Sequence, residues 1–264
     1  MTTELIDSLR ELRLPAVRDS YQEHAEQSRR EGHSYERYLA SLMEHEIAQR
    51  RHKRIARMLR DSSLPLEKTL DTFERKRLPG SVDAQLSVLL EGGFLDRHEN
   101  VLVFGNPGSG KTHLLCALAQ ELVHQDRRVL FRTCDLLVQD LLRAKAELRL
   151  DRALKRLARY HALVIDDIGY VRQSRQEMEV LFTLLAHRYE RGSVLLSSNL
   201  AFSHWEQIFK DPMTTAAAID RLVHHSVILE LNISSFRLQA AKGRSRNSKS
   251  PSPMGEGPKQ ADTP

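Results

Sequence analysis

Cysteine and long apolar runs are scarce in this sequence. Only Cys116 and Cys134 occur among the 264 residues, which is too few for a disulfide framework and lacks the spacing of a metal site. Purely apolar runs, such as 114–119, are far shorter than the ~20 residues of a membrane-spanning helix. Residues 1–10 carry two acidic side chains and no apolar segment of a secretory signal. These absences favour a cytoplasmic protein with no membrane segment.

The excess of positively charged side chains is also small. Lys and Arg number 40 against 35 Asp and Glu, and the formal net charge of +5 invites a nucleic-acid partner. Residues 242–264 contain five basic and two acidic side chains, so more than half of the excess lies in this tail. Net charge alone therefore does not identify a partner, and local clusters have to be considered.

The spacing of apolar residues changes along the chain. Residues 4–60 have helical spacing, interrupted at Pro15 and Gly32, which predicts two or three helices, the longest at 35–59. From residue 100, apolar runs alternate with helical segments, the pattern of parallel βαβ units in a sheet covered on both faces. The expected strands are 101–105, 128–133, 162–167, 193–199 and 227–231, and the expected helical segments are 111–125, 135–160, 173–191 and pieces of 203–225.

This pattern predicts three regions. We expect a small all-helical N-terminal domain at 1–70, which contacts DNA or a protein partner, and an α/β nucleotide-binding domain with a parallel sheet at 71–241. Residues 242–264 have almost no apolar side chains, so we expect a disordered tail rich in basic residues and proline.

A phosphate-binding loop follows the first expected strand. Residues 105–112 read GNPGSGKT, which satisfies the pattern GxxxxGK[ST] between a strand and a helix. Its glycines let backbone N–H groups turn toward a phosphate at the positive end of the helix. Lys111 would contact the β- and γ-phosphates of ATP, and Thr112 would bind Mg²⁺. The predicted nucleotide-binding residues are Gly105, Asn106, Pro107, Gly108, Ser109, Gly110, Lys111, Thr112 and His113.

Acidic and amide side chains follow two later strands. Asp166 would hold Mg²⁺, in part through water, and Asp167 would orient or deprotonate an attacking water. A strand that simply ends in an acidic turn is the alternative. Asn199 follows the next strand and would lie beside the γ-phosphate if that strand neighbours the phosphate loop, or it could be a helix N-cap.

Arginines and histidines near the C-terminus are less specific. Arg221 and Arg237 could each aim at a γ-phosphate, in the same or a neighbouring subunit, or form a surface salt bridge. Adjacent residues on a helix diverge by about 100°, so we expect His224 and His225 to be structural and not to share a metal. Trp205 is expected to pack in the interior.

Basic residues cluster between positions 50 and 60 without an acidic residue among them. The cluster is either a solvated helix face or a surface that contacts DNA phosphates. The DNA-contact candidates are Arg50, Arg51, Lys53, Arg54, Arg57, Lys145, Arg149 and Arg152.

The motifs together resemble those of the IstB-like ATPases, the transposition helpers of bacterial insertion sequences, in the AAA+ group that also contains the DnaC helicase loader. The resemblance is carried by residues 105–114, 164–169, 195–211 and 216–238. It implies a P-loop AAA+ ATPase that uses ATP and Mg²⁺, self-assembles on duplex DNA and directs a transposase encoded nearby. By residue, it implies Walker A at 105–112, Walker B at Asp166 and Asp167, sensor 1 at Asn199, a trans-acting arginine finger at Arg221 and sensor 2 at Arg237.

Two features depart from the family pattern. Many AAA+ proteins have Glu where this chain has Asp167, which is one methylene shorter, and the tail after residue 241 has no counterpart. Two other functions stay open: a DnaC-like replicative helicase loader, and a DNA-binding scaffold in which ATP only supports assembly. A neighbouring transposase gene would favour the transposition helper, and a neighbourhood of replication genes would favour the loader. Tight ATP binding with undetectable hydrolysis would favour the scaffold.

Overall fold

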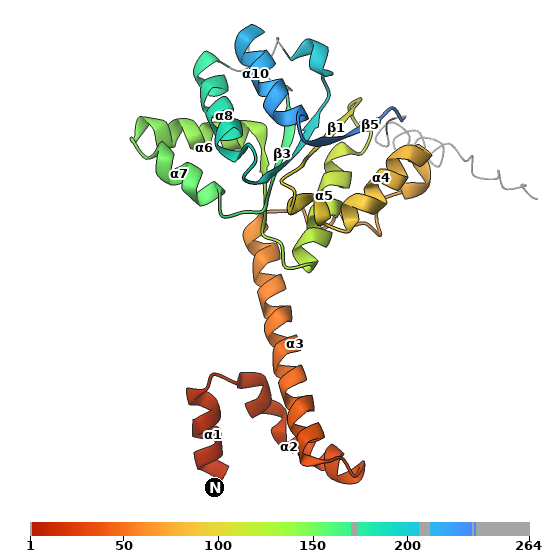
Figure 1. The fold of residues 1–264 in the computed structure, drawn as a ribbon, viewed down its shortest axis with the longest axis vertical. Coiled ribbons are helices and arrows are strands. Elements are labelled where there is room, and N and C mark those ends of the chain that lie inside the picture. The colour runs from red at the N-terminus through yellow and green to blue at the C-terminus, as the bar shows by residue number, and fades with distance from the viewer. Residues whose placement is uncertain (1, 170–173, 206–211, 234, 236–264) are drawn as a thin grey trace, which may run out of the picture.

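The computed structural model describes residues 2–169, 174–205, 212–233 and 235. In these parts, three helices project as an arm from an α/β body (Figure 1). We call residues 2–62 the helical arm. It consists of α1 (Thr2–Glu11), α2 (Pro15–Arg30) and α3 (Tyr35–Ser62).

The longest helix is α3, which joins the arm to the body. It has 28 residues and is about 42 Å long at 1.5 Å per residue. The helix begins where the Ser34 hydroxyl accepts the backbone N–H of Arg37 at 3.2 Å. It ends before Ser63, whose φ of 58° is left-handed. The prediction of a long helix starting at residue 35 is confirmed, with three more residues at its end than expected.

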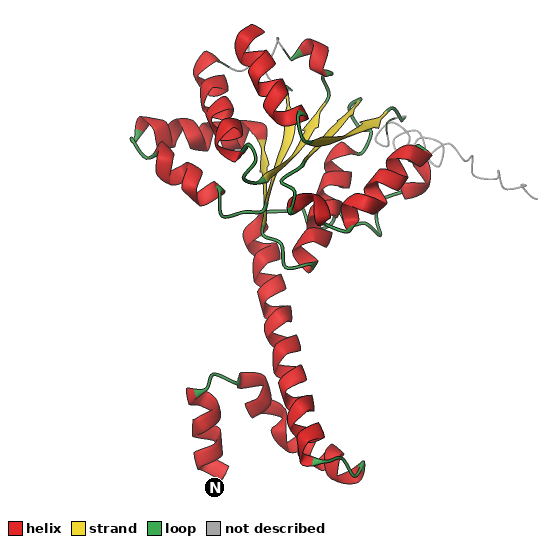
Figure 2. Cartoon of the chain, in the orientation of Figure 1, coloured by secondary structure: helices red, strands yellow, loops and turns green. Residues whose placement is uncertain are grey.

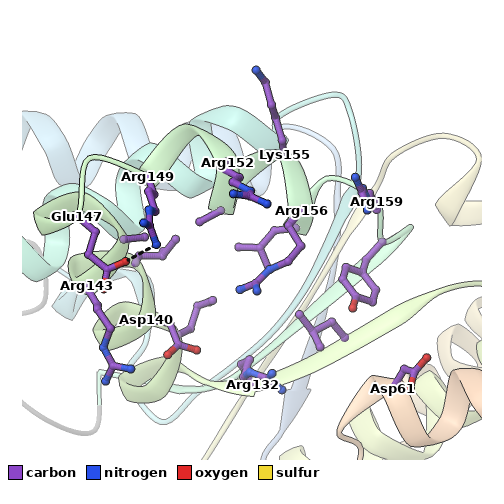
Figure 3. A pocket seen from close by; sticks show the side chains of 17 residues that line it. Asp61, Arg132, Asp140, Arg143, Glu147, Arg149, Arg152, Lys155, Arg156 and Arg159 are labelled. Atoms are coloured by element: carbon purple, nitrogen blue, oxygen red, sulfur yellow. Dashed lines mark hydrogen bonds and ion pairs between the residues drawn. The ribbon is translucent and has the colours of Figure 1, made fainter.

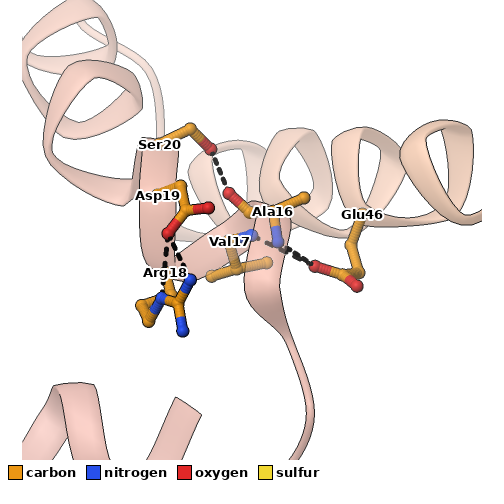
Figure 4. Close-up of polar contacts among 6 residues, drawn as sticks. All are labelled: Ala16, Val17, Arg18, Asp19, Ser20 and Glu46. Carbon is orange, nitrogen blue, oxygen red and sulfur yellow. Dashed lines mark hydrogen bonds and ion pairs between the residues drawn. The ribbon is translucent and has the colours of Figure 1, made fainter. Parts of the chain in front are cut away.

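A buried carboxylate holds α2 against α3 (Figure 4). Glu46 of α3 is 3% exposed and accepts the backbone N–H groups of Ala16 at 2.8 Å and Val17 at 3.1 Å. It thereby caps the first turn of α2 from another helix. Arg50 donates to the same carboxylate at 2.7 Å. The apolar core beside it is small: Leu9, Val17 and Leu42 are buried, and Leu14, Tyr21, Tyr38 and Met43 pack against them. The polar contact adds to what holds the arm together.

The body is a five-stranded parallel sheet in the order β2-β3-β4-β1-β5. Figure 2 shows helices on both faces of the sheet. The predicted parallel α/β fold is confirmed, and each strand begins and ends within one residue of its expected range. The strands are β1 (Asn100–Gly105), β2 (Val129–Thr133), β3 (Ala162–Ile168), β4 (Ser193–Ser198) and β5 (Ser226–Leu231).

Two apolar cores cover the two faces. One contains buried side chains of α4 (Gly80–Leu90) and α5 (Lys111–His124). The other contains those of α6 (Cys134–Ala146), α7 (Leu150–Leu157), α8 (Arg175–Arg188) and α10 (Pro212–Val223). Trp205 is fully buried in the second core, as expected. Short 3-10 helices lie at Arg75–Arg77, Gly93–Leu95 and Phe202–His204.

Two expectations are wrong. The helical segment expected at 135–160 is two helices, α6 and α7, because the chain turns at Leu148, which has a φ of 55° and is 96% exposed. His224 and His225 do not diverge on a helix, because α10 ends at Val223 and their ring centroids are 4.2 Å apart.

The arm docks on the body through the C-terminal half of α3. Arg54 donates two hydrogen bonds to Asp126, at 2.6 and 2.8 Å, in the turn after α5. These hydrogen bonds lower the pKa of Asp126. Arg51 donates to the carbonyl of His124 at 3.3 Å. The expected boundary at residue 70 stays a prediction. The segment after α3 contributes Leu64 to the core of the body.

Among the described residues, no helix is long and apolar enough to cross a lipid bilayer.

The Glu46 contact predicts an acid-sensitive arm. Burial would raise the pKa of Glu46, but hydrogen bonds from Arg50, Val17 and Ala16 outweigh it, so the net pKa is lowered. Because the pKa of Glu46 is lower in the folded protein, the contact stabilises the arm at pH values above the unfolded-state pKa of about 4.3. This stabilisation is lost as the pH falls through the folded-state pKa. Replacing Glu46→Gln should destabilise α2 by about 1 to 3 kcal/mol at pH 7.

Hydrogen exchange of α2 amides, followed by mass spectrometry between pH 4 and 8, measures this loss, with α8 amides as an internal reference. The exposed Glu44→Gln change on the same helix is the matched control. Unchanged α2 protection in the Glu46 variant would contradict the assigned role.

Candidate functional site

Three neighbouring strands bring the predicted site residues to one edge of the sheet. Because β3, β4 and β1 are adjacent and parallel, their carboxyl ends meet there. The loop after β1, the end of β3 and the residue after β4 surround a cavity of about 290 Å³. Its lining residues are Lys68, Thr72, Phe73, Glu74, Pro107, Gly108, Gly110, Lys111, Thr112, His113, Asp167 and Asn199.

The loop between β1 and α5 is built for an anion. Gly110 has a φ of 94° and precedes the first residue of α5, so the loop turns directly into the positive end of a helix. Gly108 has a φ of 80°, and a Cβ there would lie 2.1 Å from the Ser235 hydroxyl. Lys111 is 6% exposed, and its Nζ donates to the carbonyls of Gly105 at 2.8 Å and Asn106 at 3.2 Å. The lysine charge is therefore held inside the loop, where a bound phosphate would need it.

Asp166 joins the loop helix to the sheet. Its carboxylate is 4% exposed, and one oxygen accepts hydrogen bonds from the Thr112 hydroxyl at 2.9 Å and the Ser197 hydroxyl at 2.5 Å. These are hard oxygen donors of the kind that Mg²⁺ prefers. Thr112 and Asp166, the two predicted Mg²⁺ ligands, are therefore hydrogen-bonded to each other.

A bulge in β3 makes the side chains of Asp166 and Asp167 point in different directions. Ile165 pairs with Leu196, but the next pair is Ile168 with Ser198, so β3 contains one extra residue. Asp167 takes up this residue with a φ of 60°, and its N–H donates to the Ser197 hydroxyl at 2.8 Å. As a result Asp166 is buried against Thr112, while Asp167 is exposed and lines the cavity.

Ser197 was not singled out from the sequence. Its hydroxyl donates to Asp166 and accepts from the N–H of Asp167, and so positions both acidic residues. The available signal was the polar cluster that ends β4. Asn199, from that cluster, is half-buried and lines the cavity, where its amide faces the same space as Asp167.

The segment between α3 and α4 forms another wall of the cavity, which the sequence did not predict. His113 Nε2 lies 3.1 Å from the Thr72 hydroxyl and 3.0 Å from the Thr69 carbonyl. The rings of Phe73 and His113 are 5.2 Å apart, edge to face. Gln120, two turns along α5, donates to the carbonyls of Pro65 and Lys68. His113, a predicted nucleotide-binding residue, therefore lines the cavity while holding this wall.

Arg221 is not brought into the cavity of its own chain. It lies on α10, with its guanidinium carbon 4.8 Å from the centroid of the Phe182 ring of α8, and it donates to the carbonyl of Ala217 at 3.0 Å. An arginine finger at this position would have to act on a neighbouring subunit. Arg237 lies outside the described residues.

A second cavity, of about 920 Å³, lies between β2, α6 and α7 and is lined by arginines (Figure 3). Lys155 points away from it in this view. Arg149 pairs with Glu147 at 3.3 Å, and the other acidic residues in the lining are Asp61 and Asp140. We call the basic residues that line this cavity the arginine groove: Arg132, Arg143, Arg149, Arg152, Lys155, Arg156 and Arg159.

Only some of the residues predicted to contact DNA lie in this groove. Arg149 and Arg152 belong to the groove, whereas Lys145 pairs with Glu179 at 2.9 Å. Of the cluster on α3, Arg50 binds Glu46, Arg51 and Arg54 contribute to docking the arm, Lys53 is exposed, and Arg57 lines a cavity next to the groove. The groove arginines that the sequence did not suggest are dispersed along the chain: Arg132, Arg143, Arg156 and Arg159.

Two solved structures have a similar fold. The DnaC helicase loader matches with a TM-score of 0.53 and 17% identity, over 62% of this chain and 96% of that one. DnaI matches with a TM-score of 0.53 and 19% identity, over 64% and 94%. At this level of identity, the likeness concerns the fold alone.

Similarity in sequence is closer to proteins of insertion sequences. An insertion sequence ATP-binding protein of Sinorhizobium fredii is 42% identical over 241 residues, which cover 90% of this chain and 80% of that protein. The ATP-binding protein of insertion sequence IS21 from Pseudomonas aeruginosa is 36% identical over 232 residues, 88% of this chain and 87% of that protein. Residues 7–244 match the family described as IstB-like ATP binding protein. The chain therefore belongs to this family, and it is an ATPase of the P-loop AAA+ class.

Proposed function

We propose that this ATPase is a transposition helper that assembles on duplex DNA with ATP and directs a partner transposase. The observation that carries the DNA part is the arginine groove, whose lining holds six arginines against only three acidic residues, while Lys155 points away from the cavity (Figure 3). Such a density of cations suits the phosphates of a nucleic acid. The relatives in insertion sequences support transposition as the setting.

A replicative helicase loader is the second candidate, because the likeness to the DnaC helicase loader, which concerns the fold alone, is compatible with it. The nucleotide site is compatible with both functions. The form of DNA that drives assembly separates them, because a transposition helper should prefer duplex DNA and a loader should prefer single strands or a helicase.

The geometry of the cavity supports ATP hydrolysis with defined roles. Lys111 would exchange the carbonyls of Gly105 and Asn106 for the β- and γ-phosphates. Thr112 and Asp166 would hold Mg²⁺, which supplies charge neutralisation on the phosphates. Asp167 and Asn199, both facing the cavity, would orient the attacking water.

Asp167 should be required for turnover but not for binding. An Asp167→Asn change removes the group that accepts a proton from water, so we expect ATP turnover to fall about 10²- to 10⁴-fold while ATP affinity changes little. Lys111→Ala should instead abolish binding. Steady-state phosphate release and equilibrium binding of a fluorescent ATP analogue measure the two effects, with the remote exposed change Asp19→Asn as the control. Turnover close to the parent rate in the Asp167 variant would exclude this role.

Arg221 should act across a subunit interface. Arg221→Ala should bind ATP yet hydrolyse it about 10³-fold more slowly, whereas the exposed Arg191→Ala change should have no effect. Mixing the Arg221→Ala and Lys111→Ala proteins, each inactive alone, should restore part of the turnover, because an intact Arg221 of one subunit then meets ATP held by the other. A mixture that stays inactive, or full activity of Arg221→Ala alone, would argue against a finger in trans.

The arginine groove should determine the salt dependence of DNA binding. Each phosphate contact contributes about 0.9 to the slope of log affinity against log salt on duplex DNA. Changing Arg149, Arg152 and Arg156 to alanine should therefore flatten this slope by up to about 2.7. The matched control is alanine at Arg10, Arg29 and Arg37, three exposed arginines of the helical arm. An equal slope in both triple variants would place the DNA elsewhere, and a preference for single strands would favour the loader.

A further inference from the structure

A group of metal-binding side chains lies at the edge of the sheet opposite the ATP cavity. Glu190 is in the turn before β4, and His224 and His225 are in the turn before β5. In the parallel sheet these turns lie at the amino ends of the strands, whereas the ATP cavity lies at the carboxyl ends. The group therefore belongs to neither the nucleotide site nor its Mg²⁺.

The three side chains already approach the spacing of a coordination sphere. One ligand atom from each residue lies within 4.8 Å of the other two. His225 Nε2 and a carboxylate oxygen of Glu190 are 3.9 Å apart. Around a tetrahedral Zn²⁺ with bonds of about 2.0 to 2.2 Å, neighbouring ligand atoms are about 3.3 Å apart. All three side chains are exposed, so rotations that leave the core unchanged would close the remaining gap.

A fourth side chain orients one of the histidines. The Tyr189 hydroxyl and His224 Nδ1 are 2.9 Å apart, within hydrogen-bonding distance. This contact leaves Nε2 of His224 as the nitrogen available to an ion. Metal-ligating histidines commonly have such a partner on the second ring nitrogen, because it fixes the orientation of the ring.

The chemistry of the donors selects the class of ion. Two imidazoles and one carboxylate suit Zn²⁺ and similar divalent transition ions, while Mg²⁺ prefers oxygen ligands and keeps its water. We propose that Glu190, His224 and His225 form a site for a divalent transition-metal ion such as Zn²⁺, with water completing the coordination. A bound ion would tie the end of α10, the helix of Arg221, to the turn between α8 and β4.

Metal titration of the full-length chain without an affinity tag tests the site. After treatment with a chelator and removal of the chelator, Zn²⁺ should bind with a stoichiometry of one by calorimetry and should raise the thermal midpoint. Co²⁺ should give visible absorption bands of a four- or five-coordinate ion with nitrogen ligands. Lys111→Ala should bind the metal normally, which separates this site from the ATP cavity.

Variants of the ligands give the decisive comparison. Glu190→Gln and His225→Gln should each weaken Zn²⁺ binding at least tenfold, and Tyr189→Phe should weaken it about tenfold by releasing the His224 ring. The exposed His52→Gln change on α3 should have no effect. Retained binding of ATP by each variant shows that the fold is intact. No Zn²⁺ binding at equimolar metal, or binding that both ligand variants leave unchanged, would overturn the proposal.

Discussion

The hydrogen-bonded, buried carboxylate of Asp166 is the contact on which the proposed ATP site depends. It accepts hydrogen bonds from Thr112, at the start of the phosphate-loop helix, and from Ser197, on the neighbouring strand. A carboxylate that is 4% exposed is costly without such partners. These two hydrogen bonds therefore connect β3, β4 and α5. The bulge that aims Asp166 inward also turns Asp167 toward the cavity, so one local irregularity positions both acidic residues.

Helix α5 links the ATP site to the helical arm. Its first turn carries Lys111 and His113, and His113 and Gln120 hold the segment that follows α3. The turn after its last residue contains Asp126, which receives the Arg54 side chain of the arm. The residues proposed to contact phosphate and the residues that contact the arm thus belong to one helix and the turn after it. The arginine groove lies beside the edge strand β2, next to the docked end of α3.

Short-range patterns accounted for most of the fold and for part of the candidate site. The strands and the phosphate loop were predictable, and Asp166 and Thr112 could be proposed as residues of one site, because apolar periodicity, glycine spacing and polar strand ends are local properties. The role of Ser197, the wall around Thr72 and the arginine groove were not, because each depends on residues that only the tertiary fold brings together. The His224 and His225 pair was misjudged, since the end of α10 at Val223 has no clear sequence signal.

The direct test of the central contact is the effect of Mg²⁺ on nucleotide affinity. Binding of a fluorescent ATP analogue would be measured with and without Mg²⁺ for the parent chain, Asp166→Asn and Asp167→Asn. Asparagine at position 166 can still accept both hydrogen bonds but loses the charge that holds the ion. Mg²⁺ should strengthen binding in the parent and in Asp167→Asn, and this gain should disappear in Asp166→Asn. A full Mg²⁺ gain in Asp166→Asn would contradict the assigned role of the Asp166 carboxylate.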